Sequence, residues 1–139
     1  MSDDLYGADL MALARDGRHA APPATTPPPE DLVEVRADNP LCGDRVLLFA
    51  QREGQDGLAT LTHRVRGCAV CKAATTLVCA AIPANRTRLD ALEAEVRAML
   101  DGGPVPPTFS PLAPAARHAS RHACVLLPFE ALRRVWAEG

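Results

Sequence analysis

The sequence has few aromatic residues and lacks a long apolar run. Only 4% of its 139 residues are aromatic although 47% are hydrophobic, so a core must be built mainly from Ala, Val and Leu. No apolar segment approaches the roughly 20 residues that cross a bilayer, which argues against a membrane protein. The acidic start, residues 1–4, lacks the basic-then-apolar order of a secretory signal. We therefore expect a cytoplasmic protein.

The sequence has no excess of basic charge. The chain has 15 Lys and Arg against 17 Asp and Glu, a net charge of -2, which gives no reason to expect binding to nucleic acid or to an anionic membrane. The length suits one domain with a modest core, so we expect a single domain over residues 1–139. The 5 cysteines of a protein without an export signal favour metal binding or catalysis over disulfides.

Apolar periodicity predicts an α+β fold. Three strands are predicted at residues 32–36, 44–51 and 58–66, with a hairpin loop at 53–57. Helical spacing is found at residues 4–16, 69–82, 85–101 and 124–137. The prolines of residues 20–30 indicate an extended connector within the domain. We expect a three-stranded antiparallel sheet with the helices packed on one face.

The stretch Gly67-Cys68-Ala69-Val70-Cys71-Lys72 lies where a strand pattern ends and a helix pattern begins. A thiol in the first turn of a helix faces unpaired backbone N–H groups and the positive end of the helix dipole, which favour its thiolate form. We therefore expect Cys68 to be ready to bind a metal or to accept sulfur.

Two more cysteines occupy similar junctions. Cys42 lies in Asn39-Pro40-Leu41-Cys42-Gly43-Asp44, where Gly43 permits a tight bend. Cys124 is predicted at the start of the last helix, with Pro128 accepted in the first turn. Three thiols and the carboxylate of Asp44 form a set of four ligands, the number that tetrahedral metals prefer. We predict a metal or cluster site made of Cys42, Asp44, Cys68 and Cys124.

The remaining cysteines and histidines leave alternatives open. Cys71 is equally compatible with a ligand that shares the ion of Cys68 and with a small core residue, while a single Cys-x-x-Cys pair excludes a Cys₄ zinc ribbon. Cys79 is about 16 Å along the helix from Cys68 and is expected to be buried. His122 is the most plausible accessory ligand or proton acceptor. His63, on an apolar strand face, is expected to be a core residue.

The three cysteine motifs, in this order and at this spacing, resemble the iron-sulfur cluster scaffold family of IscU, SufU and NifU N-terminal domains. The resemblance extends from Leu5 to about Trp136. It implies a small α+β domain in which Cys42, Asp44, Cys68 and Cys124 surround a surface site. It also implies a cysteine desulfurase as sulfur donor and apo iron-sulfur proteins as acceptors.

The chain departs from the family pattern at three points. Ala123 precedes the third cysteine where the IscU group has histidine, which favours the SufU branch. The Leu-Pro-Pro-Val-Lys segment that a chaperone reads is absent, because residues 111–117 read Pro-Leu-Ala-Pro-Ala-Ala-Arg. Cys71 stands where the family usually has serine.

Three functions fit the residues. The first is a scaffold or carrier that accepts sulfur from a desulfurase and holds a transferable [2Fe-2S] cluster or iron, with Asp44 as a labile ligand. The second is a zinc-dependent sulfurtransferase of SufU type, an enzyme in which Cys124, by resemblance, accepts the persulfide sulfur. The third, least favoured, is a zinc-stabilised interaction domain without transfer chemistry.

Overall fold

The computed structural model describes residues 7–21 and 32–137. The helices are α1 (Ala8–Arg15), α2 (Ala69–Ala80), α3 (Arg86–Leu100), the 3₁₀ segment η1 (Pro107–Arg117) and α4 (Ala119–Ala137). The strands are β1 (Leu32–Asn39), β2 (Asp44–Glu53), β3 (Gly57–Arg66) and β4 (Ala84–Asn85). Residues 4–6 of the first predicted helix and most of the predicted connector, residues 22–30, lie outside the described residues.

The sheet has four strands in the order β1-β2-β3-β4, all antiparallel. The three long strands and the α+β class agree with the sequence prediction, but the predicted count of three strands was wrong. β4 pairs Ala84 and Asn85 with Leu58 and Gly57, because the chain leaving α2 passes beside the start of β3 before α3 begins. A two-residue strand carries no periodic signal in the sequence.

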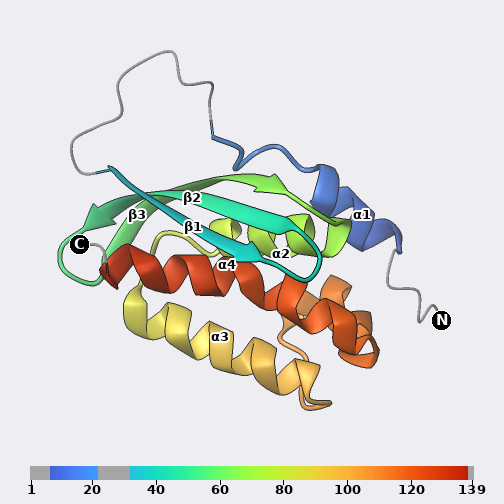
Figure 1. Cartoon of the computed structure of the whole chain (residues 1–139). Coiled ribbons are helices and arrows are strands. Elements are labelled where there is room, and N and C mark those ends of the chain that lie inside the picture. Colours follow the sequence, from blue (N-terminus) through green and yellow to red (C-terminus); the bar gives the residue numbers. More distant parts are fainter. Residues whose placement is uncertain (1–6, 22–31, 138–139) are drawn as a thin grey trace.

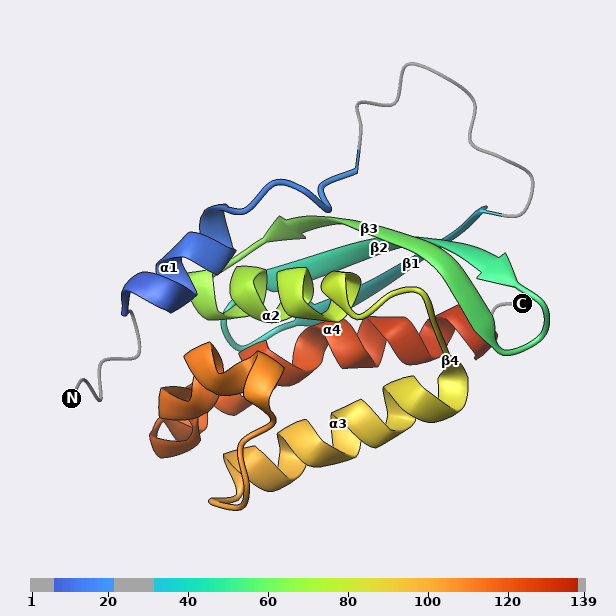
Figure 2. The ribbon, with the colours of Figure 1, turned by 180° about the vertical axis from the view of Figure 1, so that it is seen from behind.

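The helices cover one face of the sheet (Figure 1). Alternate strand residues, including Val35, Val46, Leu48 and Leu61, are buried, as expected for a sheet with one covered face. α4 packs on β1 and β2, while α2 packs on β3. Figure 2, seen from behind, shows α2 along the sheet, α1 beside its first turns and α3 in a further layer. The core therefore lies between the sheet and the pair α2 and α4.

The hairpin between β1 and β2 has a tight end. Gly43 has a φ of 75°, which residues with a side chain rarely adopt, and its N–H donates to Asn39 O at 2.8 Å. The Asn39 side chain closes the same turn by accepting from Leu41 N at 3.1 Å. Asn39 pairs with Asp44, so residues 40–43 form the end of the hairpin. Cys42 is thereby presented beyond the sheet.

The last helix is longer than predicted. α4 begins at Ala119, not near residue 124, because the small and polar residues before Cys124 continue the helix in the N-terminal direction. The prediction that Cys124 opens this helix was therefore wrong, and Pro128 lies inside it. Proline has no N–H, so the Cys124 carbonyl four residues earlier lacks its usual intrahelical donor.

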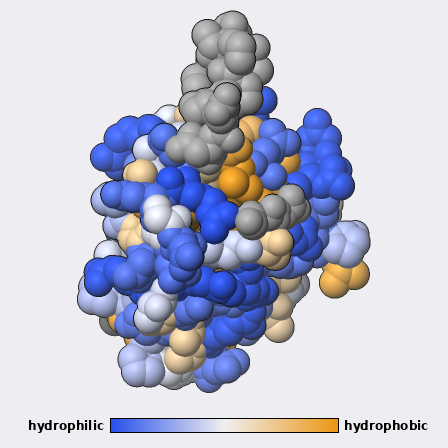
Figure 3. Space-filling view, turned by 90° about the vertical axis from the view of Figure 1, so that its left-hand side faces the viewer, coloured by the Kyte–Doolittle hydropathy of each residue, from blue (hydrophilic) through white to orange (hydrophobic). Residues whose placement is uncertain are grey.

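An ion-pair cluster joins α3 to α4. Glu93 is 7% exposed and accepts from Arg97 Nε at 2.9 Å, and it also pairs with Arg133 of α4. The side of the molecule shown in Figure 3 is mainly hydrophilic, with a few small apolar areas. Within the described residues, no helix has the length and apolar character that crossing a membrane requires.

Candidate functional site: a thiol and carboxylate group

The four predicted ligands come from four separate places in the fold. Cys42 lies in the hairpin end, Asp44 is the first residue of β2, Cys68 is the N-cap of α2 and Cys124 lies in the second turn of α4. The hairpin end, the end of β3 and the start of α2 meet at the same end of the sheet. We refer to Cys42, Asp44, Cys68 and Cys124 as the thiol–carboxylate group.

The ligand atoms of this group converge. The Sγ atoms of Cys42 and Cys124 are 3.9 Å apart, and one carboxylate oxygen of Asp44 completes a set whose atoms all lie within 4.8 Å of one another. The Sγ atom of Cys68 is 3.6 Å from Asp44 Oδ2. Two thiolates bound to one tetrahedral ion at about 2.3 Å are about 3.8 Å apart, so the Cys42–Cys124 separation suits a shared ion.

Asp44 is held in place by its surroundings. Its side chain is buried, at 3% exposure, and Oδ1 accepts the N–H of Cys68 at 3.0 Å. A Cβ atom at Gly67 would lie 2.4 Å from the same Oδ1, closer than atoms approach without displacement. The absence of a side chain at Gly67 thus leaves room for the carboxylate. Sequence reasoning missed this role, although the glycine directly before Cys68 was its signal.

Hydrogen bonds within the group set the protonation of its thiols. The pKa of Cys68 is lowered to about 6, mainly because the Cys124 thiol donates to the Cys68 sulfur, and the N–H groups of Cys71 and Val70 add to the effect. The pKa of Cys124 is raised, because the hydrogen bond to Cys68 requires its proton and because the thiol is buried beside Asp44. The expected thiolate at the start of α2 is confirmed in direction, with Cys124 as its largest cause.

The pKa of Asp44 reflects opposing influences. Burial acts to raise it, but the neighbouring Cys124 and Cys42 thiols and the N–H of Cys68, which donates to the carboxylate, outweigh burial and lower it. The carboxylate therefore stays ionised at neutral pH and adds a negative charge where a metal cation would bind.

Exposure differs sharply between the three thiols. Cys42 is exposed and Cys68 is half-buried, whereas Cys124 is 0% exposed. An exposed thiol is open to a partner protein, while a buried thiol with a raised pKa is a poor nucleophile. In this state Cys42 and Cys68 are the accessible sulfurs, and Cys124 needs a movement of the hairpin end or of its side chain to be reached.

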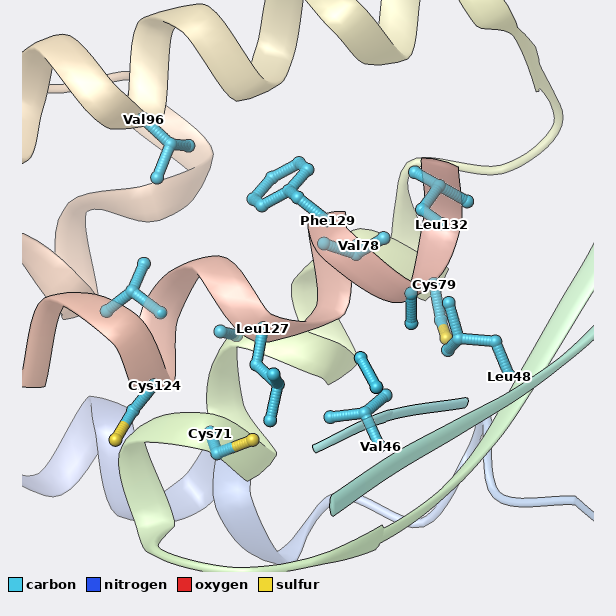
Figure 4. Packing of buried hydrophobic residues seen from close by; sticks show 14 of the residues in the cluster. Val46, Leu48, Cys71, Val78, Cys79, Val96, Cys124, Leu127, Phe129 and Leu132 are labelled. Carbon is cyan, nitrogen blue, oxygen red and sulfur yellow. The ribbon is translucent and has the colours of Figure 1, made fainter. Parts of the chain in front are cut away.

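The other two cysteines lie in the core. Figure 4 shows Cys71 on α2 with its sulfur directed toward Val46, and Cys79 further along the same helix near Leu48. Cys71 is 0% exposed and Cys79 is 2% exposed. Burial raises the pKa of Cys79 to about 12 and raises that of Cys71 as well. The prediction that Cys79 is buried is confirmed. Of the two alternatives for Cys71, a metal ligand or a small core residue, the structure shows the core residue.

Neither histidine joins the group. The Nε2 atom of His122 lies 3.1 Å from Ala116 O, which gives that nitrogen a partner in η1. His63 is 8% exposed on the covered face of the sheet, as expected for a core residue. Burial lowers the pKa of its imidazole, and neither ring nitrogen has a hydrogen-bond partner among the described residues.

The chain thus combines an antiparallel sheet covered by helices on one face with thiols and a carboxylate gathered at the end of that sheet. Neither the protein-family models nor the curated proteins contain a match. Solved structures do match. The N-terminal part of a nitrogen-fixing NifU-like protein from Brucella abortus superposes with a TM-score of 0.83 at 23% identity, covering 98% of this chain and 96% of that chain.

Two further structures share the fold. A proposed iron-sulfur cluster assembly scaffold protein for the SUF system from the thermophilic Fervidobacterium islandicum AW-1 has a TM-score of 0.73 at 20% identity, covering 96% of this chain and 98% of that chain. A hypothetical protein has a TM-score of 0.68 at 22% identity, covering 92% of this chain and 96% of that chain. The resemblance to NifU-like and SufU scaffold proteins is thus confirmed in the fold, and the expected closeness to the SufU branch stays a prediction.

Proposed function

We propose that the protein is an iron-sulfur cluster assembly scaffold or carrier. Its substrate would be iron and sulfide, held as a transferable cluster by Cys42, Asp44, Cys68 and Cys124. The observation that carries this proposal is the convergence of the Cys42 and Cys124 thiols with the buried Asp44 carboxylate, against which the Cys68 sulfur also lies, on the fold of the NifU-like and SufU proteins.

The donor set suits a cargo that must be released. Thiolates bind iron and zinc strongly, whereas a carboxylate oxygen is a harder and weaker ligand for the same ions. Asp44 therefore provides the weakest of the four bonds. Cys42 lies on the exposed hairpin end, so a partner has direct access to one edge of the site. By resemblance, the partners are a cysteine desulfurase that supplies sulfur and apo iron-sulfur proteins that accept the cluster.

Anaerobic reconstitution tests the scaffold proposal. Purified chain is incubated with ferrous iron, cysteine and a cysteine desulfurase, and the visible spectrum and acid-labile sulfide are measured. We expect cluster absorption with sulfide in the wild type, its loss in Cys42→Ser and its retention in Cys79→Ser, a matched cysteine away from the site. A colourless protein that keeps stoichiometric zinc under these conditions contradicts the proposal.

The second candidate is a zinc-dependent sulfurtransferase. The specific observation in its favour is the compact set of Cys42, Asp44 and Cys124, whose sulfur separation of 3.9 Å suits a single tetrahedral ion. Zinc, when bound, would stabilise the thiolates of Cys42 and Cys124. The Cys124 thiolate would attack the outer sulfur of a desulfurase persulfide, the S–S bond of that persulfide would break, and the desulfurase cysteine would leave as a thiolate. This candidate predicts that Cys124→Ala keeps most of its zinc but accepts no sulfur. Equal loss of both argues against a separate nucleophile.

A further inference from the structure

The start of α2 carries a pair of cysteines, of which Cys68 belongs to the thiol–carboxylate group and Cys71 does not. Cys68 is the N-cap residue, with an extended backbone at φ -73° and ψ 165°, and Cys71 lies three residues further in the first turn. The Cys68 carbonyl accepts the N–H of Lys72 at 3.1 Å, so the helical hydrogen bonds begin at Cys68 itself. The two cysteines are therefore held by one turn of helix.

The spacing of these residues permits a disulfide. Helical geometry places Cα atoms three residues apart at about 5 Å, within the range of roughly 4.4–6.8 Å found for disulfides. The N–H of Cys71 donates to the Sγ of Cys68 at 3.4 Å, which keeps the Cys68 sulfur above the first turn. The Cys71 sulfur is directed toward Val46 (Figure 4), so bond formation requires a change of its χ1 rotamer.

The two thiols differ in accessibility, and thiol–disulfide exchange needs one thiol that an outside disulfide can reach and a second thiol close to it. Cys68 is half-buried and can be attacked or can attack from solvent, whereas Cys71 is completely buried and reacts only with a neighbour inside the protein.

We propose that Cys68 and Cys71 form a redox-active dithiol, which exchange with a small disulfide converts into an intramolecular disulfide, and that this oxidation removes Cys68 from the thiol–carboxylate group. The same chain then binds its metal through Cys68 or forms the disulfide, but not both. This inference does not depend on which metal or cluster the group holds.

The reaction balances with oxidised glutathione as the disulfide. The Cys68 thiolate attacks one glutathione sulfur, the glutathione S–S bond breaks, and one glutathione leaves as a thiolate. Cys71 then gives up its proton and attacks the Cys68 sulfur of the mixed disulfide, which expels the second glutathione. The two cysteines lose two electrons in total, and oxidised glutathione gains them to become two glutathione thiols.

Peptide mapping of the metal-free full-length chain tests the disulfide. Trypsin cleaves after Arg66 and Lys72, so both cysteines are released in the single peptide 67–72, whereas Cys42 and Cys124 fall in other peptides. After incubation with oxidised glutathione we expect peptide 67–72 to lack two hydrogen atoms. A map in which Cys68 is linked to Cys124, or in which only Cys42 and Cys124 are linked, overturns the proposal.

Two variants sharpen this test. Cys71→Ser cannot complete the second step, so we expect a stable mixed disulfide between Cys68 and glutathione. Cys79→Ser, a matched change of a buried cysteine on the same helix, is expected to form the internal disulfide as the wild type does. If circular dichroism shows that Cys71→Ser does not fold, the wild-type peptide map alone decides.

Zinc titration tests the consequence for the site. We expect the oxidised chain to bind zinc roughly tenfold or more weakly than the reduced chain, and bound zinc to slow disulfide formation. Unchanged zinc affinity after complete formation of the disulfide overturns the claim that Cys68 is shared. If the reduced chain binds neither zinc nor iron, the proposed function fails, while the peptide map still decides the redox inference.

Discussion

The sulfur atoms of Cys42 and Cys124 lie 3.9 Å apart although 82 positions separate the two residues in the chain. One belongs to an exposed hairpin end and the other to a buried turn of α4. Their approach depends on the packing of α4 against β1 and β2, so the site is a product of the whole fold and not of a local motif. Changes that leave every ligand in place but alter this packing should therefore affect metal binding.

Gly67→Ala keeps all four ligand residues but displaces one of them. Its Cβ would lie 2.4 Å from Asp44 Oδ1, so the carboxylate must move away from Cys68 N. We expect a loss of stability of about 1–3 kcal/mol from the forced displacement and a metal affinity lower by about 10- to 100-fold. Urea unfolding and zinc titration measure the two effects.

Gly17→Ala is the matched control for this variant. A Cβ at Gly17 would meet no atom within 4 Å, and its φ is not positive. Metal affinity should therefore stay at the wild-type value. Normal metal binding by Gly67→Ala contradicts the placement of the Asp44 carboxylate against Gly67.

Thiol reactivity reports the unequal protonation of the cysteines. Because the pKa of Cys68 is lowered to about 6, its alkylation by iodoacetamide in the metal-free chain should reach half of its maximal rate near pH 6. Cys79, buried and with a pKa raised to about 12, should remain unmodified over the same range. Peptide masses after alkylation at graded pH measure both residues. A half-maximum near the ordinary thiol value of 9.0 contradicts the hydrogen bond from Cys124 to Cys68.

The sequence predicted the parts of the fold that repeat along the chain. Alternation in residues 44–51 and 58–66 located β2 and β3, and helical spacing located α3, where Asn85 Oδ1 accepts from Arg88 N at 2.9 Å. The two-residue β4 has no period and was missed. The start of α4 was misplaced because Pro128 was assumed to lie in a first turn, whereas the helix extends past it.

The ligands of the candidate site were easier to predict than their surroundings. A glycine beside a cysteine, a Cys-x-Asp step and a helix start are visible in sequence, so Cys42, Asp44 and Cys68 stood out. The direction of the Cys71 side chain depends on how α2 is rotated against the sheet. The space that Gly67 leaves for Asp44 involves two residues 23 positions apart in the chain. Such contacts between distant elements have no local sequence signal.

The ionised state of Asp44 should appear in the pH dependence of stability. Because folding lowers the pKa of this carboxyl, its contribution is complete above the ordinary value of 3.8 and is lost as the pH falls through the lower folded value. We expect Asp44→Asn to be less stable than the wild type at neutral pH, with a difference that shrinks below about pH 4. Urea unfolding of both metal-free proteins between about pH 3 and pH 7 measures it.

The control for this series is Asp90→Asn, which alters an exposed carboxylate of α3. Its stability difference from the wild type should be small. A difference for Asp44→Asn that grows on acidification would mean that burial, and not the hydrogen bonds from Cys68, Cys42 and Cys124, dominates the carboxyl.

The ion pairs of Glu93 should contribute to stability without affecting metal binding. Glu93 is 7% exposed and binds Arg97 of its own helix and Arg133 of α4, so it joins α3 to the helix that carries Cys124. Glu93→Gln keeps the shape but removes the charge, and leaves both arginines with a weaker acceptor. We expect a loss of about 1–3 kcal/mol in the free energy of unfolding, measured in urea, with unchanged zinc stoichiometry.

The control is Glu95→Gln, which changes an exposed residue of α3 and should have almost no effect. Loss of zinc binding by a folded Glu93→Gln would instead show that α3 helps to set the position of Cys124 through Arg133 of α4.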